Sequence, residues 1–154
     1  MDVLANMPPP MTGIDACLSD GFHLDNGVKI TGGAGVLLVG GEAFAWTPWL
    51  KSEGAESKDK ASMINQKGQW EVSEDSWGVL DLMWPKPDLL ILGLGASTFP
   101  ISPATRRRIN EMGIRVDIQD TRNAAAQFNL LATERGISAI AAALIPIAWK
   151  GQNR

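Results

Sequence analysis

The sequence predicts a single three-layer α/β domain, in which helices pack on a mixed, mostly parallel β-sheet, with an N-terminal β-hairpin. Two observations lead to this fold class. In the second half of the chain, three apolar strand-like segments alternate with two helical segments, an order typical of parallel strands joined by right-handed crossovers. Near the N-terminus, Asn26-Gly27 separates two short alternating runs, and this dipeptide favours a tight hairpin turn because both residues tolerate positive φ. The length of 154 residues fits one domain.

The first half of the domain is expected to consist mainly of short strands. The diglycine at 40–41 lacks the Gly-Lys-Ser/Thr sequence of a phosphate-binding loop, so we expect a turn there. A helix should begin after Ser73, a suitable N-cap, and should end before Pro85, because the residue before proline avoids the α region. The predicted strands are 22–25, 28–31, 36–39, 42–46 and 70–72.

The second half shows clear strand and helix boundaries. Ser102 is the expected N-cap of a helix that has Pro103 at its first position and stops at Gly113. Asp120 or Thr121 is expected to cap a second helix, which ends at Gly136. The three strands are predicted at 88–92, 114–118 and 137–145, and the first and last are apolar enough to be covered on both faces of a sheet.

The composition changes along the chain and suggests how it is organised. Residues 1–20 contain three consecutive prolines and few regularly spaced apolar residues, so we expect an irregular, extended arm. Residues 51–67 are rich in charges of both signs and poor in apolar side chains, which predicts a flexible surface insertion. The predicted organisation is therefore an N-terminal arm (1–20), one α/β domain (21–148) and a C-terminal tail (149–154).

The scarcity of reactive side chains excludes several classes of site. Cys17 is the single cysteine and His23 the single histidine, so a disulfide within the chain, a cysteine-ligated iron–sulfur cluster and a structural zinc site are excluded. A serine or cysteine catalyst would have to use His23, which is expected on a hairpin strand with a structural role. The net charge of −3 argues against nucleic-acid binding.

The sequence shows no membrane-spanning run and no targeting signal. Its apolar runs are too short to cross a bilayer, so no transmembrane segment is expected. The first 28 residues contain neither lysine nor arginine, whereas secretory signals and mitochondrial transit peptides are basic.

Two loops at strand ends are candidates for a small-molecule pocket. Gly93 and Gly95 follow an apolar strand, and residues 120–123 follow the next strand, where α/β sites often form. Asp117 and Asp120 could act as a general acid/base pair. The alternative is structural: the glycines would allow a tight loop, and Asp120 or Thr121 would cap a helix. The pocket candidates are Gly93, Gly95, Asp120, Thr121 and Asn123, and no metal ligand or catalytic set is predicted.

Three tryptophans are candidates for binding a protein partner. Trp46 and Trp49 flank a proline at the start of the charged insertion, and Trp149 lies near the C-terminus. Core packing is equally compatible with the position of Trp46 on an alternating strand. The run Arg106-Arg107-Arg108 is expected on a helix, where successive residues point about 100° apart and cannot form one flat patch. We interpret it as a solvated face, with an interface role as the alternative.

Residues 21–46, 68–95 and 113–146 resemble the mitochondrial complex I assembly factor 3 family. In that family, a strand that ends in Gly-x-Gly is followed one strand later by Gln-Asp-Thr-x-Asn-Ala and then by Ala-Ala-Leu-Ile-Pro. The corresponding residues here are Gly93 and Gly95, then 119–124, then 142–146. The resemblance covers about residues 21–148, with the insertion outside it, and the insertion and arm look like those of a fungal-type member.

This resemblance implies a small α/β domain that is not an enzyme and holds no cofactor. It implies a chaperone-like factor in the assembly of NADH:ubiquinone oxidoreductase, located on the matrix side of the mitochondrial inner membrane. The implied partners are complex I assembly factor 4 and quinone-module subunits of complex I. Two alternatives stay open: a small-molecule-binding domain or enzyme that uses the Gly93–Gly95 and Asp120–Asn123 loops, and an accessory subunit of the mature complex.

Overall fold

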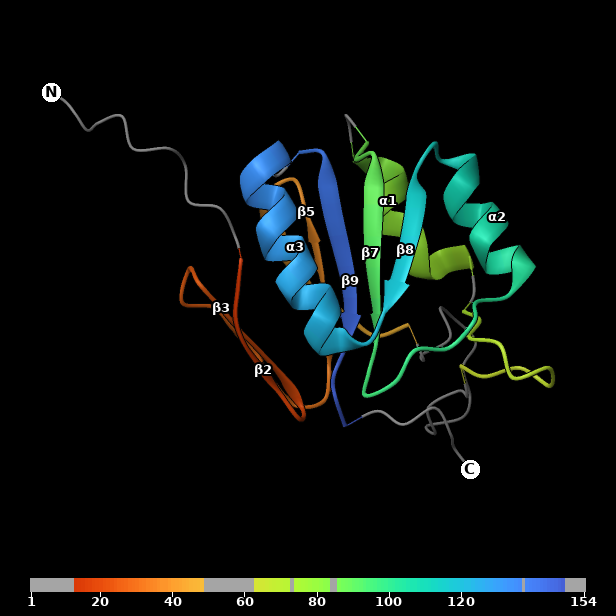
Figure 1. Cartoon of the computed structure of the whole chain (residues 1–154), viewed down its shortest axis with the longest axis horizontal. Coiled ribbons are helices and arrows are strands. Elements are labelled where there is room, and N and C mark those ends of the chain that lie inside the picture. The colour runs from red at the N-terminus through yellow and green to blue at the C-terminus, as the bar shows by residue number, and fades with distance from the viewer. Residues whose placement is uncertain (1–12, 49–62, 73, 84–85, 137, 149–154) are drawn as a thin grey trace, which may run out of the picture.

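The computed structural model describes residues 13–48, 63–72, 74–83, 86–136 and 138–148. Within these ranges the chain folds into the predicted α/β architecture, with helices on both faces of a central sheet (Figure 1).

The central sheet has five strands in the spatial order β6-β5-β9-β7-β8. β7 pairs in parallel with β8 and with β9, whereas β5 pairs antiparallel with β6 and with β9. Gly40 and Gly41 join β5 to β6 with φ values of 62° and 82°, the positive values that a two-residue hairpin turn requires. The strand bounds are Gly35–Val39 (β5), Glu42–Trp46 (β6), Leu89–Leu94 (β7), Arg115–Gln119 (β8) and Ile140–Ile145 (β9).

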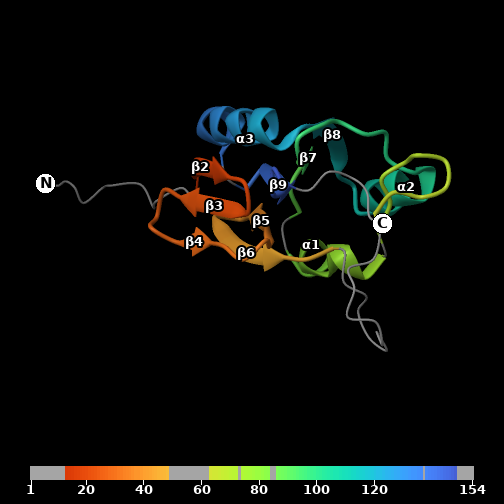
Figure 2. The same ribbon diagram turned by 90° about the horizontal axis from the view of Figure 1, so that it is seen from below.

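The two long helices cover opposite faces of this sheet. α2 (Pro103–Glu111) packs Ile109 in one core cluster with Leu90 and Leu92, whereas α3 (Thr121–Arg135) packs Phe128 in the other cluster with Ile91. Because β8 and β9 flank β7 on opposite sides, two crossovers of the same hand place their helices on opposite faces. Figure 2 shows α3 and α1 on the two sides of the strands.

The predicted Ser102 cap of α2 is confirmed, and of the two candidates for the cap of α3 the structure selects Asp120. The Ser102 hydroxyl accepts a hydrogen bond from the Thr105 amide at 3.1 Å, and Pro103 is the first residue of α2. The Asp120 carboxylate accepts one from the Asn123 amide at 3.2 Å at the start of α3. Gly136 follows the last residue of α3 with a φ of 99°, which explains why a glycine ends this helix.

A second, three-stranded antiparallel sheet contains β2 (Ile14–Leu18), β3 (Gly21–Leu24) and β4 (Lys29–Ile30). The predicted hairpin is confirmed, because β3 and β4 flank the Asn26-Gly27 turn. The expectation of an irregular arm is wrong for residues 14–18, which form β2. The sequence pattern did not reveal this strand because its side chains are mostly half-exposed, and its order comes from backbone pairing with β3.

Asn129 fixes β2 to α3. Its side-chain oxygen accepts a hydrogen bond from the Ile14 amide at 2.9 Å, and its side-chain nitrogen donates one to the Ile14 carbonyl, also at 2.9 Å. The amide group therefore pairs with the strand as a neighbouring strand would, and it satisfies both backbone groups of one residue. No sequence signal marked Asn129 for this role.

The expected insertion 51–67 is shorter than predicted at its C-terminal end. Met63 is 2% exposed and belongs to a core cluster, and Ile64 forms an antiparallel bridge with Trp70. Met63 and Ile64 are therefore packed into the domain, whereas Gln66 and Lys67 are exposed and 51–62 lie outside the described residues. The predicted strand at 70–72 is reduced to isolated bridges of Trp70 with Ile64 and Ile101.

The helix expected after Ser73 begins as a 3₁₀ turn, η1 (Glu74–Trp77), and continues as α1 (Gly78–Leu82). Ser73 lies outside the described residues, and α1 has Trp77 as its N-cap without a side-chain cap bond. The Lys86 ammonium donates hydrogen bonds to the carbonyls of Asp81 at 2.8 Å and Met83 at 3.1 Å, so a cation satisfies acceptors at the helix C-terminus. Among the described helices, none has the length and apolar character needed to cross a bilayer.

Replacing Asn129 with alanine should detach β2 from α3. We expect Asn129→Ala to lower the free energy of unfolding by about 1–3 kcal/mol, because two partly buried backbone groups lose their partner. Hydrogen exchange should accelerate at residues 14–18 more than in β7 and β9. Glu134→Ala, a change at an exposed position of the same helix, is the control. Unchanged protection of β2 in Asn129→Ala would contradict this account.

The Cys17 thiol should make stability fall at high pH. Burial raises the pKa of this half-buried thiol above its ordinary value of 9.0, although the nearby Arg122 guanidinium acts in the opposite direction. The unfolded chain therefore loses this proton first as the pH rises, and the free energy of unfolding declines above about pH 9. Urea unfolding at several pH values should show a steeper decline for the wild type than for Cys17→Ala. Equal slopes would show that this thiol is not responsible.

Candidate functional site

The structure brings the two predicted loops together at the C-terminal ends of β7 and β8. The Gly95 amide donates a hydrogen bond to the Thr121 hydroxyl at 2.8 Å, and the Thr121 amide donates one to the Gly95 carbonyl, also at 2.8 Å. The loop after β7 is thus fastened directly to the first residue of α3.

Thr121 also connects these two elements to β9. Its hydroxyl donates a hydrogen bond to the Ile145 carbonyl at 2.6 Å, and the residue is 0% exposed. One hydroxyl therefore accepts from the β7 loop and donates to the end of β9, so both of its hydrogen-bonding capacities are used inside the domain. The sequence identified Thr121 as a cap or pocket candidate and did not indicate this link to Ile145.

Gly93 is required by the close approach of α3 to β7. A Cβ at this position would lie 2.7 Å from the Leu144 Cδ2 atom, 2.9 Å from the Thr121 Cα atom and 3.0 Å from the Ala124 Cβ atom. Gly95 has a φ of 92°, a value that disfavours other residues. The conformations of both glycines are thus accounted for by packing and by the turn.

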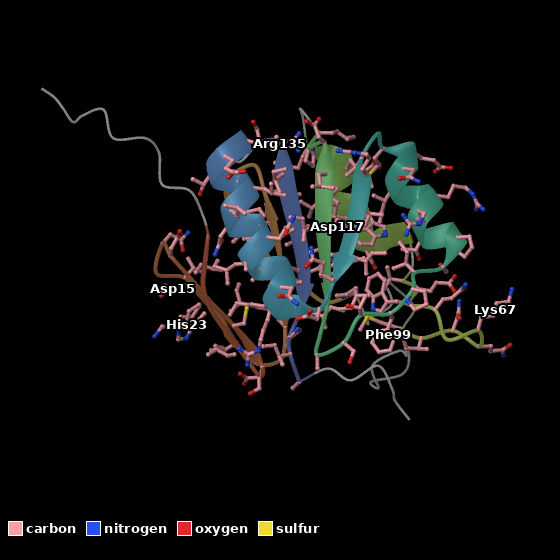
Figure 3. All side chains as sticks on the ribbon, in the orientation of Figure 1. Asp15, His23, Lys67, Phe99, Asp117 and Arg135 are labelled. Carbon is pink, nitrogen blue, oxygen red and sulfur yellow. The ribbon has the colours of Figure 1, made fainter. Side chains whose placement is uncertain are left out.

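The polar side chains of the second loop bond mainly to one another. Asp120 accepts a hydrogen bond from the Asn123 side-chain nitrogen at 2.6 Å, in addition to its bond with the Asn123 amide. Asp117 accepts one from the Gln119 side chain at 3.0 Å and lies half-buried on β8 (Figure 3). These contacts hold the loop in shape, and the Asn123 side chain is exposed to solvent.

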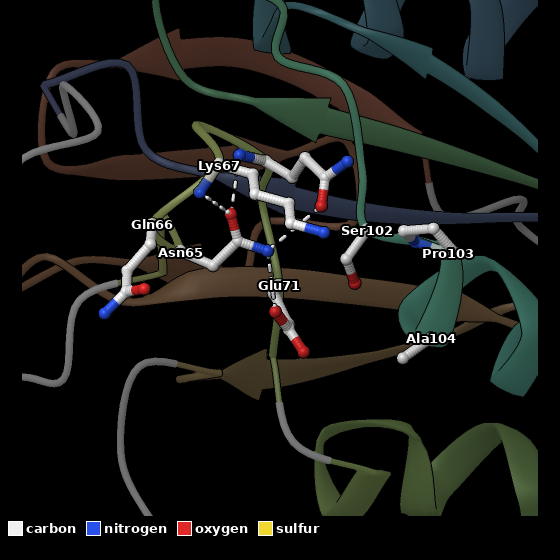
Figure 4. Close-up of a pocket in the computed structure, with 8 residues that line it drawn as sticks. Asn65, Gln66, Lys67, Glu71, Ser102, Pro103 and Ala104 are labelled. Carbon is white, nitrogen blue, oxygen red and sulfur yellow. Dashed lines mark hydrogen bonds between the residues drawn. The ribbon is translucent and has the colours of Figure 1, made fainter.

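A separate open hollow of about 350 Å³ lies where the 65–71 loop meets the start of α2. Asn65 organises its wall: the side-chain oxygen accepts from the amides of Lys67 and Gln69, and the side-chain nitrogen donates to the Glu71 carboxylate at 2.8 Å (Figure 4). Ser102 lies at the opposite wall, where its hydroxyl is occupied by the α2 cap. Sequence reasoning missed this hollow because 65–67 were assigned to the insertion.

Of the three tryptophans predicted to bind a partner, Trp46 lies in the core. It is 6% exposed and packs with Trp70 and Trp77, with ring centroids 5.4 Å apart for Trp46–Trp77 and 6.4 Å apart for Trp46–Trp70. Its indole N–H donates to the Ser76 carbonyl at 3.0 Å. The core alternative for Trp46 is therefore the one the structure adopts, whereas Trp49 and Trp149 lie outside the described residues.

His23 and the acidic residues do not assemble a metal site in the part of the chain that the structure describes. His23 lies on β3, opposite Ala16 of β2 and Lys29 of β4, whereas Asp117 lies on the other sheet (Figure 3). The histidine therefore occupies the hairpin position that the sequence predicts.

Relatives of this chain are known from several animals. The protein is similar to "NADH dehydrogenase [ubiquinone] 1 alpha subcomplex assembly factor 3" of Danio rerio, with 38% identity over 76 residues, which are 49% of this chain and 42% of the relative. The Homo sapiens protein of the same name is 34% identical over 76 residues (49% and 40%), and that of Drosophila melanogaster is 39% identical over 80 residues (49% and 39%). The matched segments span about two-fifths of these relatives.

Solved structures share the fold at low sequence identity. A protein from Bartonella henselae, described as an outer membrane protein, superimposes with a TM-score of 0.64 at 17% identity and covers 90% of this chain and 97% of its own. A Mth938-like domain from Bordetella pertussis superimposes with a TM-score of 0.57 at 15% identity, over 96% and 93% of the two chains. At these identities the likeness concerns the fold alone.

The predicted resemblance to complex I assembly factor 3 is confirmed by these relatives, which carry that name. One family also matches almost the whole described chain, from residue 14 to residue 145: the family of proteins of unknown function DUF498/DUF598. Because this match covers well over half of the sequence, the chain belongs to the DUF498/DUF598 family.

Proposed function

We propose that this protein is a non-catalytic assembly factor for mitochondrial respiratory complex I. The observation that carries the proposal is the similarity to relatives named as assembly factor 3 of NADH dehydrogenase. The protein would act in a chaperone-like manner, binding complex I assembly factor 4 and quinone-module subunits until they dock. It would do so on the matrix side of the inner membrane, without a cofactor.

The way the strand-end loops are built supports a binding role over catalysis. In many α/β enzymes the C-terminal ends of parallel strands leave polar groups free for a ligand. Here the Thr121 hydroxyl, the Gly95 backbone and the Asp120 carboxylate bond to other groups of the domain. A domain of this kind would therefore act by binding partners at its surface and not through a reaction centre.

Two other functions make different experimental predictions. An accessory subunit of the mature complex would be present in the finished enzyme in equal amount with the other subunits. A small-molecule-binding domain would respond to ligands, either at the Gly93–Gly95 and Asp120–Asn123 loops or at the hollow beside Asn65.

Purification of the tagged full-length protein from mitochondria should recover assembly factor 4 and quinone-module subunits. We expect these partners in assembly intermediates and a much lower amount of the protein in finished complex I, measured by quantitative mass spectrometry after native separation. A tagged matrix protein of similar size is the control. Absence of every quinone-module subunit and of assembly factor 4 would refute the assembly role, and equal amounts in the finished complex would favour an accessory subunit.

Removing the Thr121 hydroxyl should destabilise the domain without creating or abolishing ligand binding. Thr121→Val keeps the shape of the side chain but leaves the Gly95 amide and the Ile145 carbonyl without this buried partner. We expect a loss of about 2–4 kcal/mol in the free energy of unfolding, measured by urea denaturation.

The ligand-binding part of this prediction is tested by thermal-shift screening of the wild type and the variant with nucleotides and metabolites. Thr133→Val, the same substitution at an exposed position of α3, is the matched control, and neither Thr121→Val nor Thr133→Val should show a ligand-induced shift. A metabolite that stabilises the wild type and fails to stabilise Asp120→Ala would instead favour a pocket at the strand-end loops.

A further inference from the structure

β8 is an edge strand with one row of backbone groups that faces away from the sheet. It pairs with β7 and stands at the end of the strand order (Figure 1). The Arg115 amide donates to the Asp88 carbonyl at 3.0 Å, on the β7 side. Because backbone groups alternate in direction along a strand, the N–H and C=O groups of Val116 and Ile118 face the free edge.

The surroundings of this edge are basic in a chain whose net charge is −3. α2 and β8 carry Arg106, Arg107, Arg108 and Arg115 against two carboxylates, Glu111 and Asp117. Arg106, Arg107 and Arg115 are exposed, and we call α2 and β8 with these three arginines the basic edge. β6, the edge strand at the other end of the sheet, begins instead with the exposed Glu42.

Helix geometry places the exposed Arg106 on the flank of α2 that faces away from α1. Arg108 pairs with Asp81 of α1 at 3.3 Å, so it marks the flank of α2 that faces α1. Arg106 lies about 200° around the helix from Arg108, on the opposite flank. In Figure 2, β8 lies above and α1 below, both to the left of α2. Arg106 and Arg115 are therefore exposed on the two elements that border the free edge of β8, whereas Arg107 lies opposite the buried face of α2 and points to solvent.

We propose that the basic edge is the docking surface for an extended acidic segment of a partner protein, which adds to β8 as a sixth strand. Backbone hydrogen bonds to Val116 and Ile118 would supply the pairing, as in other cases of strand addition. Arg106 and Arg115 would select carboxylates on the incoming segment, because opposite charges attract across neighbouring strands. This inference rests on the proposed function, since it gives the partner-binding role a surface and a partner chemistry.

The test uses the whole protein and two short synthetic peptides, one alternating glutamate with valine and the other alternating lysine with valine. We expect the acidic peptide to shift the NMR signals of the Val116 and Ile118 amides, with a Kd in the millimolar range or tighter that weakens as salt is added. The basic peptide should leave these signals unchanged. No shift at β8 up to about 5 mM acidic peptide would overturn the proposal.

Matched arginine variants distinguish docking at the basic edge from non-specific electrostatic attraction between the acidic peptide and the protein. Arg106→Glu and Arg115→Glu should each raise the Kd about three- to tenfold, the range for reversing one exposed charge contact. Arg107→Glu makes the same charge change on the solvent side of the same helix and should change the Kd much less. Equal weakening by Arg106→Glu and Arg107→Glu, or pairing of the acidic peptide with β6, would overturn the proposal.

The result of the peptide experiment and the result of the purification from mitochondria test different proposals. Failure of the peptide to bind leaves the assembly role in place with a different docking surface. If the peptide binds at β8 but the purification recovers no complex I protein, the basic edge is supported as a docking surface and the assembly role is refuted.

Discussion

The buried hydroxyl of Thr121 connects β7, α3 and β9, and the arrangement of the rest of the domain depends on these three elements. Thr121 accepts a hydrogen bond from the loop that ends β7 and donates one to the last residue of β9, while its own backbone begins α3. Gly93 makes this possible, since any side chain there would collide with Leu144, Thr121 and Ala124. The position of α3 on the sheet, and with it the position of β2 through Asn129, depends on this junction.

This junction occupies the place where many α/β domains bind their ligands. Polar groups that could face a substrate at the strand ends are engaged in holding the loops to the helix and to the neighbouring strand. In the proposed assembly role, a domain built in this way would act through its outer surfaces. The exposed edge of β8 is the surface that we propose for this role, because a terminal strand retains hydrogen-bonding groups that a neighbouring chain can use.

How well the sequence predicted a structural feature depended on whether the residues that stabilise that feature are close together in the chain. The Asn26-Gly27 turn and the caps at Ser102 and Asp120 are set by residues within a few positions. The turn and the Ser102 cap were predicted correctly, and the second cap was narrowed to Asp120 or Thr121. β2 and the packed residues Met63 and Ile64 were missed because no regular apolar pattern along these segments marks them as strands. Ile14 is fixed by Asn129, 115 positions away, and Ile64 by a bridge to Trp70 whose own strand is a single residue.

The sequence by itself determined the fold class, the cap of α2 and the resemblance to assembly factor 3, because these follow from local chemistry and residue order. Its single cysteine and single histidine limited the kinds of site that could be expected. Only the tertiary structure decided that Trp46 packs in the core with Trp70 and Trp77, that Thr121 connects three elements, and that β8 ends the sheet beside Arg106. The physical reason is the same in each case: burial and strand order depend on contacts between segments far apart in the chain, and periodicity along one segment carries no information about them.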